Sequence, residues 1–600
     1  MTTWQAEARH FLDHETQFHL GMLPSEQAHA KTRGLADVLQ QDVAAGLRLL
    51  QSVDEEVADS AEGVLASEAF AELVRVLTST FTAGGRVCFS GCGATGRLSI
   101  LLEACWRHFW QTAADRDPEL GAVCQGLGDQ VCSIMTGGDY ALIRSVENFE
   151  DHVAFGRQQV REAGLGEGDV LVAISEGGET SSVIGTIWEA HERGARTFFA
   201  FNNPADILAE HIERSRDVIE HPDVIILDLT SGPMGVAGST RMQATTAELL
   251  VVGAALDLAC EAVLPEAVAA RERDADATMQ TPQEYMNAFC SLLADLAQPT
   301  SVAAMADWTA FERDLYERKG LITYFADECL LDIFTDTTER SPTFMLPPFR
   351  KCDDTISLPS WAFVKSPLLS TPNAWERVLG RPTRCLEWTP ELYAQMDAPE
   401  NVRRQPPVLG AAAIQKFHIG SEADISRTAP TATAAVLAVL GSELNGAGDS
   451  AASVSAAFGP AAEGFAERAA IVIGGEEPEP SGVERIFHVP CAIAPTHMKL
   501  FERLAVKLAF NNVSTATMGC MGRLVGNWMA FVDTSNKKLI DRGSRLVSEL
   551  AEVDYETACY ALHETNEMLR TTLSPGDEKP SPVALTIERL QQPPLEPRTS

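Results

Sequence analysis

The stretch GCGATGRLSILLEACW, residues 91–106, joins a glycine-rich turn to the start of a helical pattern, directly after the apolar run 86–90. The spacing Gly-x-Gly-x-x-Gly lets backbone amides approach an anion, and the helix that follows presents its positive end to the same place. In open α/β sheets, ligands bind at the carboxyl ends of the strands, where this turn lies. The pattern predicts a phosphate-binding loop that contains Gly93, Ala94, Thr95, Gly96 and Arg97.

A nucleotide is the weaker interpretation of this loop. The sequence has no GxxxxGK[ST] motif and no Asp or Glu at the end of a following strand to bind an adenine ribose. A second loop, ISEGGETSSVIG at 174–185, also follows a strand and offers glycine amides and hydroxyls at a helix start. Alone it could be an N-cap cluster. Two such loops in neighbouring units predict a sugar phosphate, bound in the second loop by Ser175, Gly177, Gly178, Thr180 and Ser181.

Strands alternate with helices in both halves of the chain. In the first half, strands are expected at 86–91, 169–175, 195–201 and 224–229. From about residue 285 the order restarts, with strands expected at 321–327, 408–414, 469–475 and 485–491. This alternation predicts parallel α/β sheets with right-handed crossovers, and 600 residues are too many for a single core.

The pattern divides the chain into four expected parts. These are an N-terminal helical segment (1–60), an α/β domain with the phosphate loops (61–284), a second α/β domain (285–545) and a C-terminal helical region with a tail (546–600). The second domain is expected to carry a long insertion at about 342–407, rich in proline. Loops that long in a compact domain are more often functional than idle.

Composition limits the classes of partner. The 47 basic and 84 acidic residues give a formal net charge of −37, which argues against nucleic acid. The thirteen cysteines show no CxxC pair and no metal-ligand spacing, so we expect free thiols, no metal and no cofactor. The N-terminus has no apolar signal core and no run approaches a membrane span, which predicts a cytoplasmic protein without membrane contact.

Several segments, taken in order, carry a resemblance to a known family. They are SGCGATGRLSIL (90–101), TGGDYALIRSVENFED (136–151), ISEGGETSSVIG (174–185), GPMGVAGSTRMQATTAELL (232–250) and NNVSTATMGCMGRLVGNWMAFVDTSNKKLIDR (511–542). The first four resemble a sugar isomerase (SIS) domain, and more narrowly the N-acetylmuramic acid 6-phosphate etherases and the related glucokinase regulatory protein. The fifth is similar to the etherases' C-terminal helical segment.

The layout of these segments resembles that of the regulatory protein. In a one-domain etherase the fifth segment follows GSTRM directly, whereas here residues 243–510 intervene. The resemblance implies two tandem SIS domains, each a parallel-sheet α/β/α sandwich of flavodoxin-like type. It also implies a phosphorylated sugar as ligand.

The resemblance assigns the remaining candidate residues. DTTERSPTF (336–344) resembles the etherases' Asp-x-x-Glu-Cys-Pro-Pro-Thr-Phe, which places Glu339 on the family's catalytic acid. Glu150 matches the second functional glutamate and Lys507 the family's lysine. The first half has Cys105 and Leu249 at the positions of Glu339 and Lys507, while the second half has FADECLLDI (325–333) in place of the glycine loop. These complementary losses predict one composite site per chain, in a monomeric pseudo-dimer or a low homo-oligomer.

The resemblance implies a two-glutamate lyase. In the etherases, D-lactate is eliminated from C3 of the sugar, and water then adds to give N-acetylglucosamine 6-phosphate. Glu339 would protonate the ether oxygen, and Glu150 would carry the proton transfer or the water step. Two alternatives stay open: a sugar-phosphate isomerase, and a non-catalytic sensor whose glutamates only hydrogen-bond sugar hydroxyls and whose protein partner would be a sugar kinase.

The second loop departs from the family. Where the etherases have Ser-Gly-Arg-Thr, this chain has Gly-Gly-Glu-Thr, so Glu179 replaces an arginine and Glu176 adds another acid. A dianionic phosphate is repelled by nearby carboxylates. The candidate counter-charges are Arg97, Arg241, Lys499 and Lys507.

Overall fold

Two five-stranded parallel sheets form the core of the protein in the computed structural model, which describes residues 3–146, 149–274, 279–445, 449–475, 480–574 and 577–591. The first sheet has the order β2-β1-β3-β4-β5, from β1 (Val87–Gly91), β2 (Val131–Met135), β3 (Val170–Ser175), β4 (Arg196–Phe201) and β5 (Val224–Asp228). The second has the order β10-β9-β8-β6-β7, from β6 (Leu321–Phe325), β7 (Ala362–Lys365), β8 (Thr433–Leu440), β9 (Glu467–Ile473) and β10 (Arg485–Val489). Across each sheet, the second strand of that half lies at one edge and is followed by the first, third, fourth and fifth. The two halves therefore share one topology, and the predicted tandem α/β fold is confirmed.

The central strands are apolar because helices cover both faces of each sheet. The strands β1, β3 and β8 are buried over their whole length, as expected of strands inside a parallel sheet. Their register is continuous: Val87 of β1 lies opposite Val131 of β2 on one side and Val170 of β3 on the other.

The expected strand at 408–414 is wrong. The structure has a short helix there, α21 (Ala411–Ile414), and the side chain of Val408 is 74% exposed. An alanine run after a glycine favours a helical turn over a strand. The central place in the second sheet belongs to β8, whose sequence TAAVLAVL is also rich in alanine. The two other strands not expected, β2 and β7, are short and lie at sheet edges.

Helices flank the first sheet on both sides. The helices of this lobe are α5 (Glu68–Thr82), α6 (Ala94–Arg116), α7 (Gly121–Gly128), α8 (Tyr140–Ile143), α9 (Val153–Ala163), α10 (Ser181–Glu192), α11 (Ala205–His211), α12 (Glu213–Ile219), α13 (Gln243–Glu261) and α14 (Glu266–Asp274), and α5, α6, α9, α10, α12 and α13 pack on the strands. The helix α13 is long and apolar enough to cross a membrane, but it is almost wholly buried and packs on α5 and on helices of the second half. It therefore serves as a core helix.

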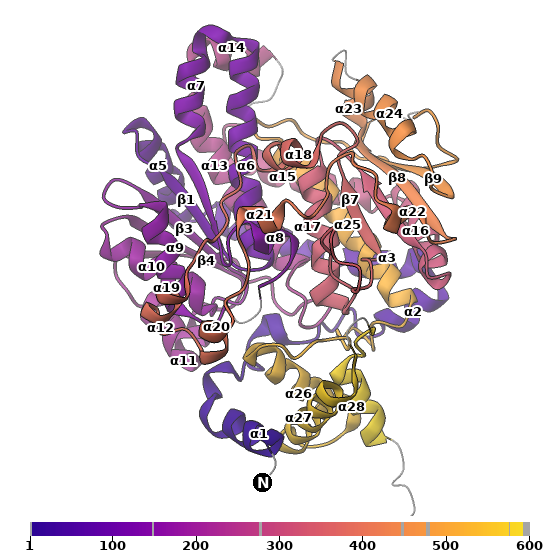
Figure 1. The fold of residues 1–600 in the computed structure, drawn as a ribbon. Helices are drawn as coiled ribbons and strands as arrows, with labels where there is room; N and C mark the ends of the chain where they lie inside the picture. Colours follow the sequence, from indigo (N-terminus) through magenta and orange to yellow (C-terminus); the bar gives the residue numbers. More distant parts are fainter. Residues whose placement is uncertain are drawn as a thin grey trace, which may run out of the picture.

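The second sheet has a matching set of helices. They are α15 (Pro282–Leu296), α16 (Pro299–Glu317), α17 (Leu330–Phe344), α18 (Thr371–Leu379), α22 (Ile425–Thr428), α23 (Gly441–Asn445), α24 (Asp449–Ala461) and α25 (Leu500–Cys520). The two lobes meet through α6, α13, α17 and α25, because α17 packs on both α6 and α25, and α13 packs on α25. Figure 1 shows the first lobe and the second lobe side by side.

The stretch 342–407, expected as an insertion, contributes to the second domain itself and also crosses to the first. It supplies β7, α18, α19 (Pro390–Gln395) and α20 (Glu400–Arg404). Beyond α18, the buried guanidinium of Arg381 pairs with Asp139 at 2.6 Å and with Glu103 at 3.0 Å. Further along, Trp388 stacks against Phe149 of the first lobe with 6.1 Å between ring centroids. The stretch therefore acts as a strap that joins the lobes.

Helices from the two chain ends form a separate unit below the lobes. The helices α26 (Lys537–Ala551), α27 (Tyr555–Thr572) and α28 (Pro582–Gln591) pack together, and α1 (Thr3–His14) packs on α27 (Figure 1). Because α26 begins at Lys537, this unit starts before the expected boundary at 546. The remaining N-terminal helices, α2 (Leu35–Gln41), α3 (Val43–Gln51) and α4 (Asp54–Leu65), pack against helices of both lobes.

Candidate active site

A cavity of about 610 Å³ lies where the two lobes and the C-terminal helical unit meet. Its wall includes residues from the β1–α6 loop, from α17 and from the segment that leads into α26. Among the predicted catalytic and loop residues, five line it: Gly93, Ala94, Arg97, Glu150 and Glu339. Of the other candidate counter-charges, Arg241 lines it and Lys499 does not. The structure therefore brings candidate residues from both lobes to one cavity.

The first glycine loop has a conformation that only small residues permit. A Cβ added to Gly91 would lie 2.4 Å from backbone atoms of Thr95, and Gly93 has a φ of +56°. The Cys92 amide donates to Thr95 Oγ1 at 3.0 Å, which fixes the turn. The first-turn amides of α6 have no partners within the helix itself, as at the helix N-termini that bind anions.

The second loop lies beside the first, and its hydroxyls are partly used within the fold. Ser175 Oγ donates to Thr180 Oγ1 at 3.0 Å, and Ser182 Oγ lies 2.8 Å from Thr136 Oγ1 of the neighbouring unit. Within the part of the chain that the structure describes, several predicted residues do not border the cavity. They are Thr95, Gly96 and Lys507, and from the second loop Ser175, Gly177, Gly178, Thr180 and Ser181.

The acid that replaces the family's arginine is neutralised. The Glu179 carboxylate pairs with Lys538 of α26 and with Arg214, both at 2.8 Å. Burial alone would raise its pKa, but these two cations lower the pKa of Glu179 to about 2. Glu179 does not border the cavity, so its negative charge is compensated before a phosphate arrives.

Glu339 meets Arg97 across the lobe boundary. The carboxylate on α17 accepts a hydrogen bond from Nη1 of Arg97, which lies in the first turns of α6. The guanidinium is 1% exposed, and its other nitrogens donate to the carbonyls of Leu142 and Ala141 at 3.1 and 3.3 Å. Arg97 is thus anchored in the first lobe and presents one nitrogen to the acid of the second.

Glu150 faces the same cavity from another side. Asn536 Nδ2 donates to Glu150 Oε1 at 2.5 Å, while Asn536 Oδ1 caps α26 by accepting from the amide of Leu539. The C-terminal helical unit is therefore part of the site. Its residues Asn536 and Lys538 were not among the predicted site residues, although the matched landmark Asn-x-Lys-Leu contains both.

Glu176 also lines the cavity, although the sequence comparison with the etherases identified it only as an extra acid in the second loop. Its Oε1 is enclosed and has no hydrogen-bond partner among the described residues. Burial and the nearby charge of Glu339 raise the pKa of Glu176 to about 7. This carboxyl therefore exchanges a proton near neutral pH, as a general acid or base does.

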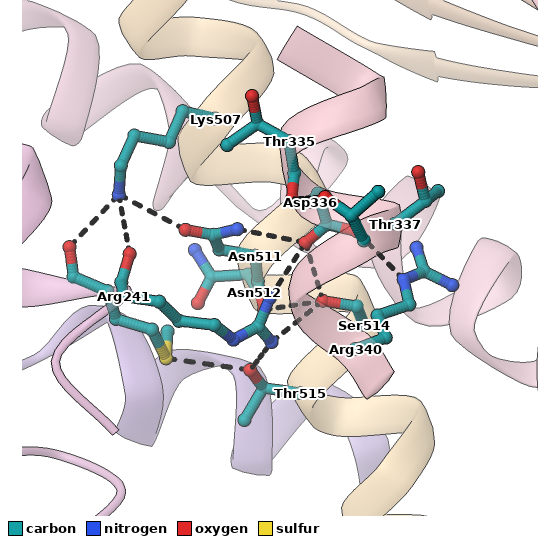
Figure 2. A network of polar contacts seen from close by, with 12 residues as sticks. Arg241, Thr335, Asp336, Thr337, Arg340, Lys507, Asn511, Asn512, Ser514 and Thr515 are labelled. Carbon is teal, nitrogen blue, oxygen red and sulfur yellow. Dashed lines mark hydrogen bonds and ion pairs between the residues drawn. The ribbon is translucent and has the colours of Figure 1, made fainter. Parts of the chain in front are cut away.

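A buried polar network supports this wall of the cavity (Figure 2). At its centre is Asp336, which accepts from Arg241, Arg340, Asn511 and Ser514 at 2.8 to 2.9 Å. Three matched sequence segments meet here: GSTRM supplies the arginine at 241, DTTERSPTF the aspartate, and NNVST the amide and hydroxyl. Because Asp336 lies one helical turn before Glu339, the network fixes the position of the catalytic candidate.

Lys507 lies behind this wall instead of on it. Its Nζ donates to the carbonyls of Arg241 and Met242 at 3.0 Å (Figure 2). It also donates to Thr246 Oγ1 at 2.7 Å. Burial lowers its pKa to about 7. Lys507 holds the GSTRM loop against α25 and is placed to support the site through that loop.

One group of described residues has donor atoms close enough to hold a metal ion: His191, His221 and Asp223. None of the three borders the cavity. The cavity wall itself carries carboxyl groups, arginines and residues of the glycine loop.

Comparisons with known proteins agree with this geometry. The sequence model of the glucokinase regulatory protein N-terminal SIS domain matches residues 69–190. The N-acetylmuramic acid 6-phosphate etherase of Klebsiella aerogenes is 30% identical over 233 residues, 39% of this chain and 68% of that protein. The etherase of Aliivibrio fischeri strain ES114 is 31% identical over 206 residues, 34% of this chain and 60% of that protein. The match with N-acetylmuramic acid 6-phosphate etherase 1 of Bacillus licheniformis, at 28% identity, covers 39% of this chain and 67% of that protein.

Solved structures with sugar-phosphate titles also align. A putative tagatose-6-phosphate ketose/aldose isomerase from Clostridium novyi covers 82% of this chain and 95% of its own, at 8% identity and a TM-score of 0.42. The tagatose-6-phosphate ketose/aldose isomerase of Escherichia coli gives 11% identity and a TM-score of 0.40, with 78% and 92% covered. These scores are too low to carry an argument about function.

Proposed function

Because this chain belongs to the family of N-acetylmuramic acid 6-phosphate etherases, we propose that it is a carbon–oxygen lyase that cleaves the C3 ether of an N-acetylated amino-sugar 6-phosphate. The observation that carries this proposal is the arrangement of Glu339, Glu150 and Glu176 around one cavity built by both lobes. The glycine loop and the N-terminus of α6 border the same cavity and would hold the phosphate.

The carboxyl groups divide the proton transfers of an elimination. Glu150 takes the proton from C2, and the C2–H electrons form the C2=C3 double bond as the C3–O bond breaks. The ether oxygen keeps the bonding pair and needs one proton. Glu339 is ion-paired with Arg97, so we assign delivery of this proton to Glu339 together with Glu176, whose pKa burial and the charge of Glu339 raise to about 7.

Water completes the reaction. The carboxyl pair, now without its proton, takes a proton from water as the oxygen adds to C3, and Glu150 returns its proton to C2. The net change is one water consumed, one 3-hydroxy sugar phosphate formed and one 2-hydroxy acid released. In N-acetylmuramic acid 6-phosphate that acid is D-lactate.

The test measures D-lactate release from N-acetylmuramic acid 6-phosphate by the wild-type protein and by E339Q and E150Q. Loss of a positioned proton-transfer group should lower kcat by about 10²–10⁴-fold, with smaller changes in affinity. The matched control is E328Q, a glutamate on the corresponding loop of the second lobe that does not border the cavity. Unchanged turnover in both E339Q and E150Q would contradict the two-carboxyl mechanism.

A second candidate function is a sugar-phosphate sensor that performs no chemistry. The match of residues 69–190 to the regulatory protein's SIS domain and the tandem layout favour it. In that case the wild-type protein should bind sugar 6-phosphates in a calorimeter without releasing lactate, and E339Q should change affinity alone. D-Lactate release by the wild-type protein would exclude this function.

A further inference from the structure

Arg144 is, within the described part of the chain, the one basic residue on the main cavity that has no carboxylate within ion-pair distance. The other six basic residues of the wall each pair with an acid: Arg97, Arg241, Arg340, Lys538, Arg542 and Lys579. Acids outnumber bases 84 to 47 in this chain, so a cation on a cavity wall without an acidic partner is unusual. Such a cation attracts an anionic group of a ligand.

A second hollow of about 460 Å³ opens beside the main cavity, and Arg144, Ser145 and Val146 belong to both. It carries another cation, Lys351, whose Nζ lies 5.2 Å from the centroid of the Tyr140 ring. Asp353, two residues along the chain, pairs with Lys416 at 2.5 Å and not with Lys351. The two hollows are therefore contiguous, and among the described residues no carboxylate lies within ion-pair distance of the two cations of the second one.

The remaining wall of the second hollow combines the polar side chains of Asn401 and Gln405 with apolar ones. Phe149 and Leu409 are buried within it, and Val408 exposes its side chain there. Cavities that take drug-sized ligands measure about 300–1,000 Å³. The main cavity by itself is large enough for a phosphorylated monosaccharide, which leaves the second hollow free for a further group.

We propose that the second hollow is a subsite for a carboxylate-ended acyl or short peptide chain attached to the amino-sugar phosphate, and that Arg144 and Lys351 bind that carboxylate. The apolar side chains of the wall contact the chain, and the two cations bind its charged end with charge-assisted hydrogen bonds. This inference rests on the proposed function for the identity of the sugar phosphate, and it names the class of substituent that the sugar carries.

The test compares two compounds by calorimetry on protein carrying E339Q, which takes turnover out of the measurement. One is N-acetylglucosamine 6-phosphate, which has no carboxylate. The other is N-acetylmuramic acid 6-phosphate with alanyl-glutamate on its lactyl carboxyl. R144Q and K351Q should each weaken binding of the peptide-bearing compound about tenfold to a hundredfold, and that of N-acetylglucosamine 6-phosphate less than about threefold.

A control variant matches the change in charge. R403Q removes an exposed arginine near the second hollow. Arg403 borders neither hollow, so R403Q should leave the binding of both compounds unchanged.

Three outcomes would overturn the subsite. If R144Q weakened the binding of both compounds equally, Arg144 would be placed on the phosphate. If the affinities did not change, the second hollow would take no ligand group. If neither compound bound the protein, both proposals would fail. Absence of D-lactate release from the wild-type protein, with the difference between the compounds intact, would contradict the proposed reaction and leave the subsite standing.

Discussion

Glu176 provides the sharpest test of the electrostatics of the cavity. Its pKa is raised from an ordinary 4.5 to about 7 by burial, and Glu339 adds repulsion, while Lys538 and Lys507 attract its charge without cancelling the burial cost. A carboxyl whose folded pKa is raised binds more protons in the folded state than in the unfolded state. Stability from this group is therefore fully present below about pH 4.5 and is lost as the pH rises to 7.

The E176Q variant removes this titration. With pKa values of 4.5 and about 7, the linkage relation gives a loss of about 2.5 kcal/mol in wild-type stability between pH 5 and pH 8. Water in the cavity screens part of the charge, so this value is an upper limit. We expect the free energy of unfolding of E176Q minus that of the wild type to increase by up to about 2.5 kcal/mol from pH 5 to pH 8.

The assay is urea unfolding followed by tryptophan fluorescence at both pH values. The matched control is E179Q, three residues along the same loop. Because Lys538 and Arg214 lower the pKa of Glu179 to about 2, this group stabilises the fold above pH 4.5, and the stability is lost only as the pH falls through 2. E179Q should therefore be less stable than the wild type at pH 5 and pH 8 alike. A difference between E176Q and the wild type that is the same at both pH values would refute a buried, proton-carrying Glu176.

Three further predictions follow from the contacts between the lobes. D336N leaves Arg241 and Arg340 without their shared carboxylate, and it should cost about 3–5 kcal/mol in urea unfolding; a cost below about 1 kcal/mol would contradict the central role of Asp336. R381L removes the buried pairs with Glu103 and Asp139, so it should weaken binding of N-acetylglucosamine 6-phosphate and lower Tm, while R404Q, which removes an exposed pair within α20, should do neither. Calorimetry with N-acetylglucosamine 6-phosphate should give one site per chain, and two equivalent sites would contradict the composite cavity.

Repetitive local patterns made much of the fold predictable from the sequence. Seven of the eight expected strands correspond to observed strands, because each is an apolar run bounded by turn residues. The exception is 408–414, an apolar run whose alanines lie in the helix α21. The central strand of the second sheet, β8, is also rich in alanine. Periodicity cannot separate these two segments; only the pairing of β8 with β6 and β9 does so.

The candidate site was predictable where a residue type is required by chemistry, and less so where position depends on the fold. The glycine loop, Glu150 and Glu339 come from motifs and lie on one cavity. Lys507 comes from the same reasoning, yet its Nζ is occupied by carbonyls behind the wall. Glu176 looked unfavourable for a phosphate because the sequence does not show that its carboxyl is enclosed and able to hold a proton.

The two halves of the chain explain why one cavity carries the catalytic candidates. The strands β1 and β6 end at Gly91 and Phe325, and Arg97 and Glu339 follow them by six and fourteen residues. At the same spacings, the opposite half has Leu331 in place of Arg97 and Cys105 in place of Glu339. Arg97 and Glu339 form the ion pair that joins the lobes at the cavity. At the mirrored position both are replaced by residues without charge. Burial raises the pKa of the Cys105 thiol to about 11, so it stays neutral.

The mirrored loop is filled by ion pairs instead of being open to a ligand. Where the first lobe has Ala94, the second has Glu328, whose carboxylate pairs with Lys499 at 2.8 Å and with Arg377 at 3.1 Å. A carboxylate at that position repels a phosphate, and its pairs occupy two cations that could otherwise bind one. In a homodimer any substitution changes both sites at once. A fused chain has no such constraint, because each half can lose the groups that only the mirrored site would use, and the losses seen in each half are those of the mirrored site.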